Sequence, residues 1–177
     1  MTTETTFLPY FQEPVKLDPD DRPYPRHHVF ETVDVDAVNA ALASGRPLLL
    51  RGKPGTGKSQ LALAAAVGLK RALVSHVIDA RAESRDLLYR FDAVRRLADA
   101  QVLNATPARF ASRRKWLGDE VKDPDLLHEQ FYIEPGPLWW ALNWKSAAEQ
   151  AEKAGLTPPV TQGDPKNGVV VLSLIHI

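Results

Sequence analysis

The segment LLLRGKPGTGKSQLA, residues 48–62, decides the fold of this chain of 177 residues. An apolar run comes first, a glycine-rich loop follows it, and an alanine-rich stretch comes after the loop. The run RPLLLRG, residues 46–52, predicts a buried parallel strand. Residues 57–71 predict a helix that is apolar nearly all round and therefore packed rather than exposed. A strand, a loop and a helix in this order are typical of an α/β domain with a parallel sheet.

The loop matches the spacing G-x-x-x-x-G-K-[S/T] of a phosphate-binding loop. Glycines permit the turns that let successive backbone N–H groups converge on phosphate oxygens, and the following helix N-terminus adds N–H groups and a positive dipole end. Lys58, the predicted catalytic residue, supplies charge to the β and γ phosphates, and the Ser59 hydroxyl is the predicted Mg²⁺ ligand. We therefore expect ATP and Mg²⁺ to bind at Gly52, Pro54, Gly55, Thr56, Gly57, Lys58, Ser59 and Gln60.

Further elements are predicted on both sides of the loop. Upstream, residues 30–45 hold apolar side chains at helical spacing and end in Gly45, which suits a C-cap. Downstream, residues 72–80 and 168–172 are rich in branched apolar residues and predict two buried strands. Residues 134–155 predict one helix, because Pro137 lies near its first turn and Gly155 just past its end.

Another helix is predicted from Ser84 onward, with Ser84 as its N-cap. Helical spacing gathers its apolar side chains on one face, which is expected to be packed: Leu87, Leu88, Phe91, Val94 and Ala98. Its basic side chains are expected to remain in solvent: Arg85, Arg95 and Arg96.

Composition bounds the class of protein. An apolar fraction of 44% and a charged fraction of 25% are ordinary for a globular domain, and the absence of cysteine excludes disulfides and cysteine-based metal sites. No apolar run approaches the roughly 18 residues of a membrane span, and the first residues lack the pattern of a signal peptide, so a cytoplasmic protein is expected. Residues 46–122 hold sixteen basic and seven acidic side chains. That balance suits polyphosphate or an acidic neighbouring subunit better than a specific nucleic-acid site.

The segment GRPLLLRGKPGTGKSQLA, residues 45–62, resembles the MoxR-like branch of the AAA+ ATPases. AVNAALASGRP (37–47) is similar to that family's lead-in, IEPGPLWWAL (133–142) looks like its G-P-L segment, and GVVVL (168–172) looks like its Walker B strand. The resemblance implies a three-layer α/β/α P-loop domain with strand order 5-1-4-3-2. It also implies a ring-forming ATPase that remodels or assembles partner proteins, which are often of the von Willebrand A type.

On this resemblance the chain divides into an extended arm (1–28), a partial nucleotide-binding domain (29–172) with a helical insertion at about 103–165, and a tail (173–177). The family places an acidic pair after the Walker B strand, where this chain reads SLIHI. One interpretation is a nucleotide-binding scaffold that does not hydrolyse ATP, with His176 as a substitute. The other, which we favour, is a truncated reading frame, because LSLIHI resembles a translated library-preparation adapter. A helicase loader that uses the basic middle is a third alternative.

Several other residues are candidates for function. Trp139, Trp140 and Trp144 could form a partner surface, although core packing is the favoured interpretation. A basic cluster could contact nucleic acid, but a solvated face is favoured: Arg109, Arg113, Arg114 and Lys115. His27 and His28 lack the second ligand cluster of a metal site. The resemblance makes Val29 and Phe30 possible adenine contacts, and Asp79 either faces the nucleotide or caps a turn.

Overall fold

The computed structural model describes residues 7–17, 26–78, 81–103, 110–117, 125–159 and 163–175. The chain forms two compact units. The first unit combines Met1–Ile78 with Val160–Ile177, and the second unit is the continuous stretch Asp79–Pro159. The second unit therefore enters the chain between two strands of the first.

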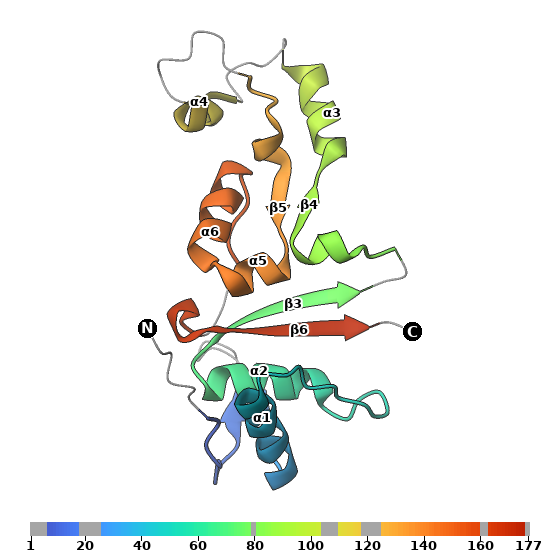
Figure 1. Ribbon diagram of the computed structural model, residues 1–177, viewed down its shortest axis with the longest axis vertical. Coiled ribbons are helices and arrows are strands. Elements are labelled where there is room, and N and C mark those ends of the chain that lie inside the picture. The colour runs from blue at the N-terminus through green and yellow to red at the C-terminus, as the bar shows by residue number, and fades with distance from the viewer. Residues whose placement is uncertain are drawn as a thin grey trace. The chain divides into compact units, whose positions relative to one another are not determined.

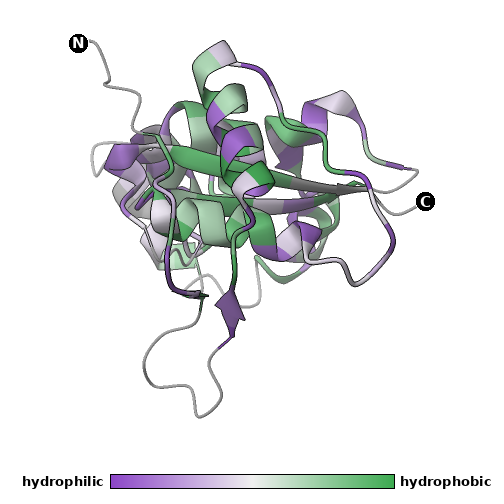
Figure 2. Ribbon diagram, turned by 90° about the horizontal axis from the view of Figure 1, so that it is seen from below, coloured by the Kyte–Doolittle hydropathy of each residue, from purple (hydrophilic) through white to green (hydrophobic). Residues whose placement is uncertain are grey.

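A parallel pair of strands is the sheet of the first unit (Figure 1). β3 (Ala72–Ile78) pairs with β6 (Val169–Ile175) over their whole length, so that Ala72 lies opposite Val169 and Ile78 opposite Ile175. Hydrophobic residues dominate both strands (Figure 2). The strands predicted at 72–80 and 168–172 are therefore confirmed where the structure describes them, and the second continues through Ser173 to Ile175.

The strand predicted at 46–52 is wrong for this structure, because these residues form no strand. Leu49 is 68% exposed and Leu48 40% exposed, whereas a buried strand would cover both side chains. The physical reason is pairing. β6 makes its ladder with β3, and the segment before the loop has no strand beside it among the described residues. Without a neighbour to bond its N–H and C=O groups, an apolar run gains nothing by extending into a strand.

Two helices pack together in the first unit. α2 (Lys58–Gly68) contacts both strands of the sheet, and α1 (Thr32–Ser44) shares a hydrophobic cluster with α2. The helices predicted at residues 30–45 from apolar periodicity and at 57–71 from an apolar stretch after the loop are both confirmed. Gly45 ends α1 in the left-handed conformation at φ 62°, which is the C-cap that the sequence indicated.

The proline-rich arm, where it is described, packs on these helices. Leu8 is 2% exposed and lies in the cluster that joins α1 to α2. Asn39 fixes the arm by accepting a bond from the Leu8 N–H at 2.8 Å and donating one to the Leu8 carbonyl at 3.0 Å. The short strands β1 (Val15–Lys16) and β2 (His27–His28) then pair antiparallel beside α2.

In the second unit, the single helix predicted from Ser84 is replaced by three elements. A 3-10 helix, η1 (Ser84–Leu87), is followed by β4 (Tyr89–Phe91) and by α3 (Ala93–Val102). Glu83, and not Ser84, is the N-cap of η1. The predicted helix is interrupted because β4 pairs antiparallel with β5 (Ile133–Pro135). Asp92 then caps the N-terminus of α3 by accepting a hydrogen bond from the Arg95 N–H at 2.8 Å.

The buried face of α3 differs from the predicted one, although Arg96 is exposed as expected. Val94 is 80% and Leu97 64% exposed, while Asp99 is only 3% exposed. Arg95, expected in solvent, donates to the carbonyls of Phe131 and Ala154. The prediction failed because inward-facing polar side chains find partners on other elements here, which periodicity alone does not reveal.

Arg113 of α4 (Ala111–Leu117) is the centre of a polar network in the second unit. Its side chain, 12% exposed, donates to Asp99 at 2.7 Å, to the Tyr132 hydroxyl at 2.7 Å and to the Leu126 carbonyl at 2.7 Å. Burial raises the pKa of Tyr132 above 10.0. The neighbouring Arg113 opposes this rise, whereas Asp99 adds to it. The expected solvated face is therefore wrong for Arg113. Arg109 and the side chains of Arg114 and Lys115 lie outside the described part.

The helix predicted at 134–155 is two helices. α5 (Pro137–Leu142) ends at Asn143, whose φ of −152° is not helical, and α6 (Trp144–Lys153) begins directly after it. The Asn143 side chain caps α6 by accepting a bond from the Ser146 N–H at 3.0 Å. Gly155, with φ of 69°, lies just past the end of α6 as predicted.

The tryptophans of this region pack within the second unit. Trp140 is 5% exposed and donates a hydrogen bond to the Pro135 carbonyl at 3.2 Å. The centroids of the Trp140 and Trp144 rings are 4.8 Å apart. Trp139 donates to the Ser146 hydroxyl at 3.3 Å. The core-packing interpretation is confirmed for Trp140.

Candidate functional site

The predicted phosphate-binding loop joins residues 46–51 to the N-terminus of α2. Gly55 and Gly57 have φ angles of 82° and 81°, in the left-handed region that other residues rarely adopt. Gly57 is the N-cap of α2, so the helix begins at Lys58, close to where the sequence places it. The two glycines therefore turn the chain sharply and present the start of the helix at the loop.

No side-chain hydrogen bond caps the N-terminus of α2. Its N-cap is a glycine without a side-chain hydrogen bond, and its first turn contains no acidic residue. Three other helices are capped by side chains, α1 by a capping box of Glu31 and Asp34, and α3 and α6 by Asp92 and Asn143, whereas α5 has Gly136 as its N-cap and no side-chain cap. Because the first N–H groups of any helix lack intrahelical partners, α2 offers uncapped donors to an anion.

The ammonium group of Lys58 lies inside the loop. It donates to the Gly52 carbonyl at 3.0 Å, to the Lys53 carbonyl at 2.6 Å and to the Thr56 hydroxyl at 3.3 Å. The Thr56 hydroxyl itself donates to the Lys53 carbonyl at 3.0 Å. The structure thus brings Gly52, Thr56 and Lys58 together, and their binding of phosphate stays a prediction.

The remaining predicted binding residues also lie at the loop. Pro54, Gly55 and Ser59 are exposed, and Gln60 is partly exposed in the first turn of α2. Ser59 is the second residue of the helix, so its hydroxyl is near the uncapped end where a cation bound to phosphate would lie. Access to the loop is therefore open in this structure.

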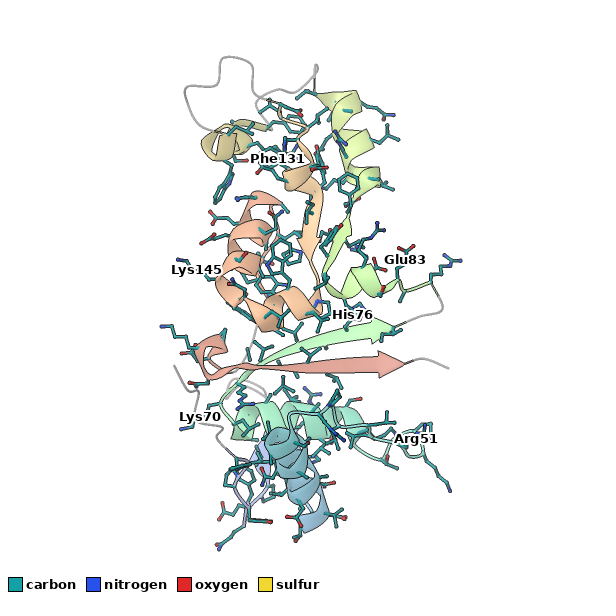
Figure 3. The ribbon with its side chains drawn as sticks, in the orientation of Figure 1. Arg51, Lys70, His76, Glu83, Phe131 and Lys145 are labelled. Carbon is teal, nitrogen blue, oxygen red and sulfur yellow. The ribbon has the colours of Figure 1, made fainter. Side chains whose placement is uncertain are left out.

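The loop is basic in sequence. Arg51, Lys53 and Lys58 lie in or beside it and residues 46–60 contain no acidic side chain, whereas Lys70 and Arg71 follow the C-terminal end of α2, away from the loop (Figure 3). Arg51 lies in the loop region before α2, and it and Lys53 are exposed (Figure 3). A polyanion approaching α2 therefore meets attraction from the side chains and from the helix dipole together.

β6, which contains most of the predicted Walker B strand, has no carboxylate side chain. β6 reads VVVLSLI over Val169–Ile175. Asp79 and His176, the other candidates near the strand ends, lie outside the described residues. No group of three or more His, Cys, Asp or Glu residues that could hold a metal ion is found in the described ranges. Mg²⁺ ligation by Ser59 stays a prediction from the loop spacing.

Of the two candidate adenine contacts, one is packed against other side chains and the other is exposed to solvent. The Phe30 ring stacks on Phe11 at 5.1 Å, and His28 meets Phe30 edge-on at 4.8 Å. Val29 is 68% exposed. Phe30 therefore packs beside the hydrophobic clusters of the first unit, while Val29 remains accessible.

Sequence reasoning missed a cavity in the second unit. It has a volume of about 560 Å³ and is lined by residues of α3, α4 and the end of α6, among them Arg95, Asp99, Arg113, Trp116 and Lys153. Lys153 lies over the Trp116 ring at 5.3 Å. Phe131, labelled in Figure 3, lies against Arg113, whose guanidinium is 5.2 Å from its ring. No sequence signal indicated this cavity, because its walls come from distant segments.

Comparisons with known proteins do not identify the class of this site. No family model, curated protein or solved structure matches the chain. Within the described residues, no helix is long and apolar enough to cross a membrane.

Proposed function

We propose that residues 52–60 bind the phosphates of ATP together with Mg²⁺. The observation that carries the proposal is the uncapped, glycine-turned N-terminus of α2 with the Lys58 ammonium inside the same loop. The spacing of Gly52, Gly57, Lys58 and Ser59 supports it independently. In this proposal the backbone N–H groups and Lys58 hold the phosphates, and the Ser59 hydroxyl ligates Mg²⁺.

Hydrolysis is a further step of the proposal. In a chain that continues with the acidic pair of the MoxR-like resemblance, those carboxylates would order the Mg²⁺ shell and position the attacking water. Such a protein would form a ring and use ATP to remodel or assemble partner proteins. A scaffold that binds ATP without turnover is the second candidate. Phosphate release by a chain extended with an acidic pair separates the two.

Replacing the loop lysine tests the binding proposal. We expect Lys58→Ala to weaken Mg·ATP binding at least about 10-fold, because a charge-assisted contact to phosphate contributes more than an ordinary hydrogen bond. Fluorescence polarisation of a labelled ATP measures the affinity. Lys145→Ala is the matched control, since Lys145 is exposed on α6 and labelled in Figure 3, and its loss should change nothing. Equal affinities of the Lys58→Ala variant and the unmodified chain would refute the assignment.

A further inference from the structure

The cavity of the second unit is large enough for a metabolite-sized ligand. Its volume of about 560 Å³ lies within the range of small-molecule sites in proteins. α3, α4 and the C-terminal end of α6 supply its walls (Figure 1). All of them belong to the continuous stretch Asp79–Pro159, whereas the phosphate-binding loop belongs to the first unit. A site in this cavity is therefore separate from the loop.

Arg95 is a cation of the cavity wall that has no acidic partner among the described residues. Its Nη2 donates to the Phe131 carbonyl and, at 2.7 Å, to the Ala154 carbonyl, and its guanidinium carbon lies 5.3 Å from the centre of the Tyr132 ring. These partners are neutral, so they do not balance its charge. A guanidinium has five N–H donors, and Nη2 supplies only two of them. Arg95 is therefore held in place while Nε and Nη1 remain for a ligand.

Lys153 places a second cation at the same wall. Its ammonium lies 5.3 Å from the centre of the Trp116 ring, and it forms no ion pair in the part of the chain that the structure describes. The acidic residues of the wall do not balance the two cations. Asp99 is paired with Arg113 at 2.7 Å, and Glu152, the remaining carboxylate, is exposed. The cavity therefore has an excess of positive charge beside an aromatic ring.

We propose that this cavity binds a small organic carboxylate with an aromatic or apolar body. A carboxylate matches the planar donor fork of a guanidinium, and the Lys153 ammonium adds a charge-assisted contact. Trp116 and Phe110, which also line the cavity, supply aromatic surface for the body of the ligand. Because Arg95 is anchored before the ligand arrives, little side-chain entropy is lost on binding. This site goes beyond the proposed function and does not depend on it.

A matched pair of probes tests which charge the cavity selects. Cinnamate is an aromatic carboxylate, and cinnamamide has nearly the same shape without the charge. We expect cinnamate to bind at least about 10-fold more tightly, because hydrogen bonds between charged groups are stronger than those to a neutral group. NMR titration of the isotope-labelled chain measures both affinities, and the indole N–H signal of Trp116, assigned by its loss in Trp116→Phe, should shift. Equal affinities, or no shift of this signal with cinnamate, would overturn the proposal.

Substitutions test whether the two cations hold the carboxylate. Lys153→Gln retains most of the side-chain length without the charge and should weaken cinnamate binding about 3- to 10-fold, while the affinity for cinnamamide stays the same. Arg95→Lys keeps the charge but loses the planar fork, and should weaken cinnamate binding by a similar factor. Cinnamate affinity that is unchanged in both variants would exclude this site.

Two further variants serve as controls for the location of the probe. Lys145→Gln removes an exposed charge from the same helix outside the cavity and should change nothing (Figure 3). Lys58→Ala should bind cinnamate as tightly as the unmodified chain, because the loop belongs to the other unit. Weaker cinnamate binding in Lys58→Ala would place the probe at the loop and overturn the proposal, whereas failure of ATP to bind would refute the proposed function alone.

Discussion

Asp99 and Arg113 form a buried ion pair that joins α3 to α4 in the second unit. The two side chains are 4% and 12% exposed, and their atoms meet at 2.7 Å. Arg113 also lies over the ring of Tyr132 at 4.8 Å. An ion pair at this depth is costly to break, because the remaining charge is left without a counter-charge in a poorly solvated place.

Removal of one partner should therefore destabilise the second unit strongly. We expect Asp99→Ala to lower the free energy of unfolding by about 3–5 kcal/mol, measured by urea titration. The double variant Asp99→Leu with Arg113→Met should recover at least half of that loss, since an apolar pair of similar volume leaves no unpaired charge. A double variant less stable than Asp99→Ala would contradict this account.

The loop residues show which features of the candidate site are determined by the local sequence. The turn at Gly55 and Gly57 and the helix start at Lys58 follow from glycine conformations and helix signals only a few residues apart. The inward bonds of Lys58 could not be predicted, because they depend on where the loop places its carbonyls. The residue types of the candidate site are thus local information, whereas the contacts of the Lys58 ammonium are not.

At the scale of elements, Asn143 separates two helices that periodicity joins. Residues 134–155 have the composition of one helix, and the break arises where the Asn143 side chain caps α6. Tertiary contacts favour the break, since both α5 and α6 then pack within the second unit and Trp140 is buried. The sequence contains the cap, but continuous helical spacing obscures it.

Substitution of Asn143 tests its capping role. Asn143→Ala should cost about 1 kcal/mol of stability, because the Ser146 N–H loses its acceptor. Asn143→Asp retains an acceptor and should remain within a few tenths of a kcal/mol of the unmodified chain. Chemical denaturation measures both. Equal stability of the Ala and Asp variants would show that the chain bends here for another reason.

At the scale of the whole molecule, the second unit is one continuous stretch with a core of its own. Phe131, Tyr132 and Phe110 are at most 1% exposed, and α3, α4 and η3 (Glu129–Tyr132) supply the contacts described above. A continuous segment with a closed core is what an independently folding domain requires.

We therefore expect residues 79–159 to fold when expressed alone. Circular dichroism during urea titration should show one cooperative transition. Phe131→Ala in the same fragment should lose about 3–5 kcal/mol, because it empties the centre of the core. A gradual, non-cooperative loss of signal in the unmodified fragment would show that its core depends on the first unit.

The sequence by itself determined the glycine-rich loop, the helices on either side of it, the Gly45 cap and the strands β3 and β6. Each depends on a residue pattern that acts over a few positions, such as a left-handed glycine, a cap or an unbroken apolar run. Only the tertiary structure decided the inward face of α3, the burial of Arg113 and the loss of the strand at 46–52. These features depend on partners far along the chain: Asp99 and Tyr132 for Arg113, and a neighbouring strand for residues 46–52. Burial of Asp99 and Arg113 and the loss of a strand at 46–52 depend on what lies opposite, which the local pattern at these positions did not specify.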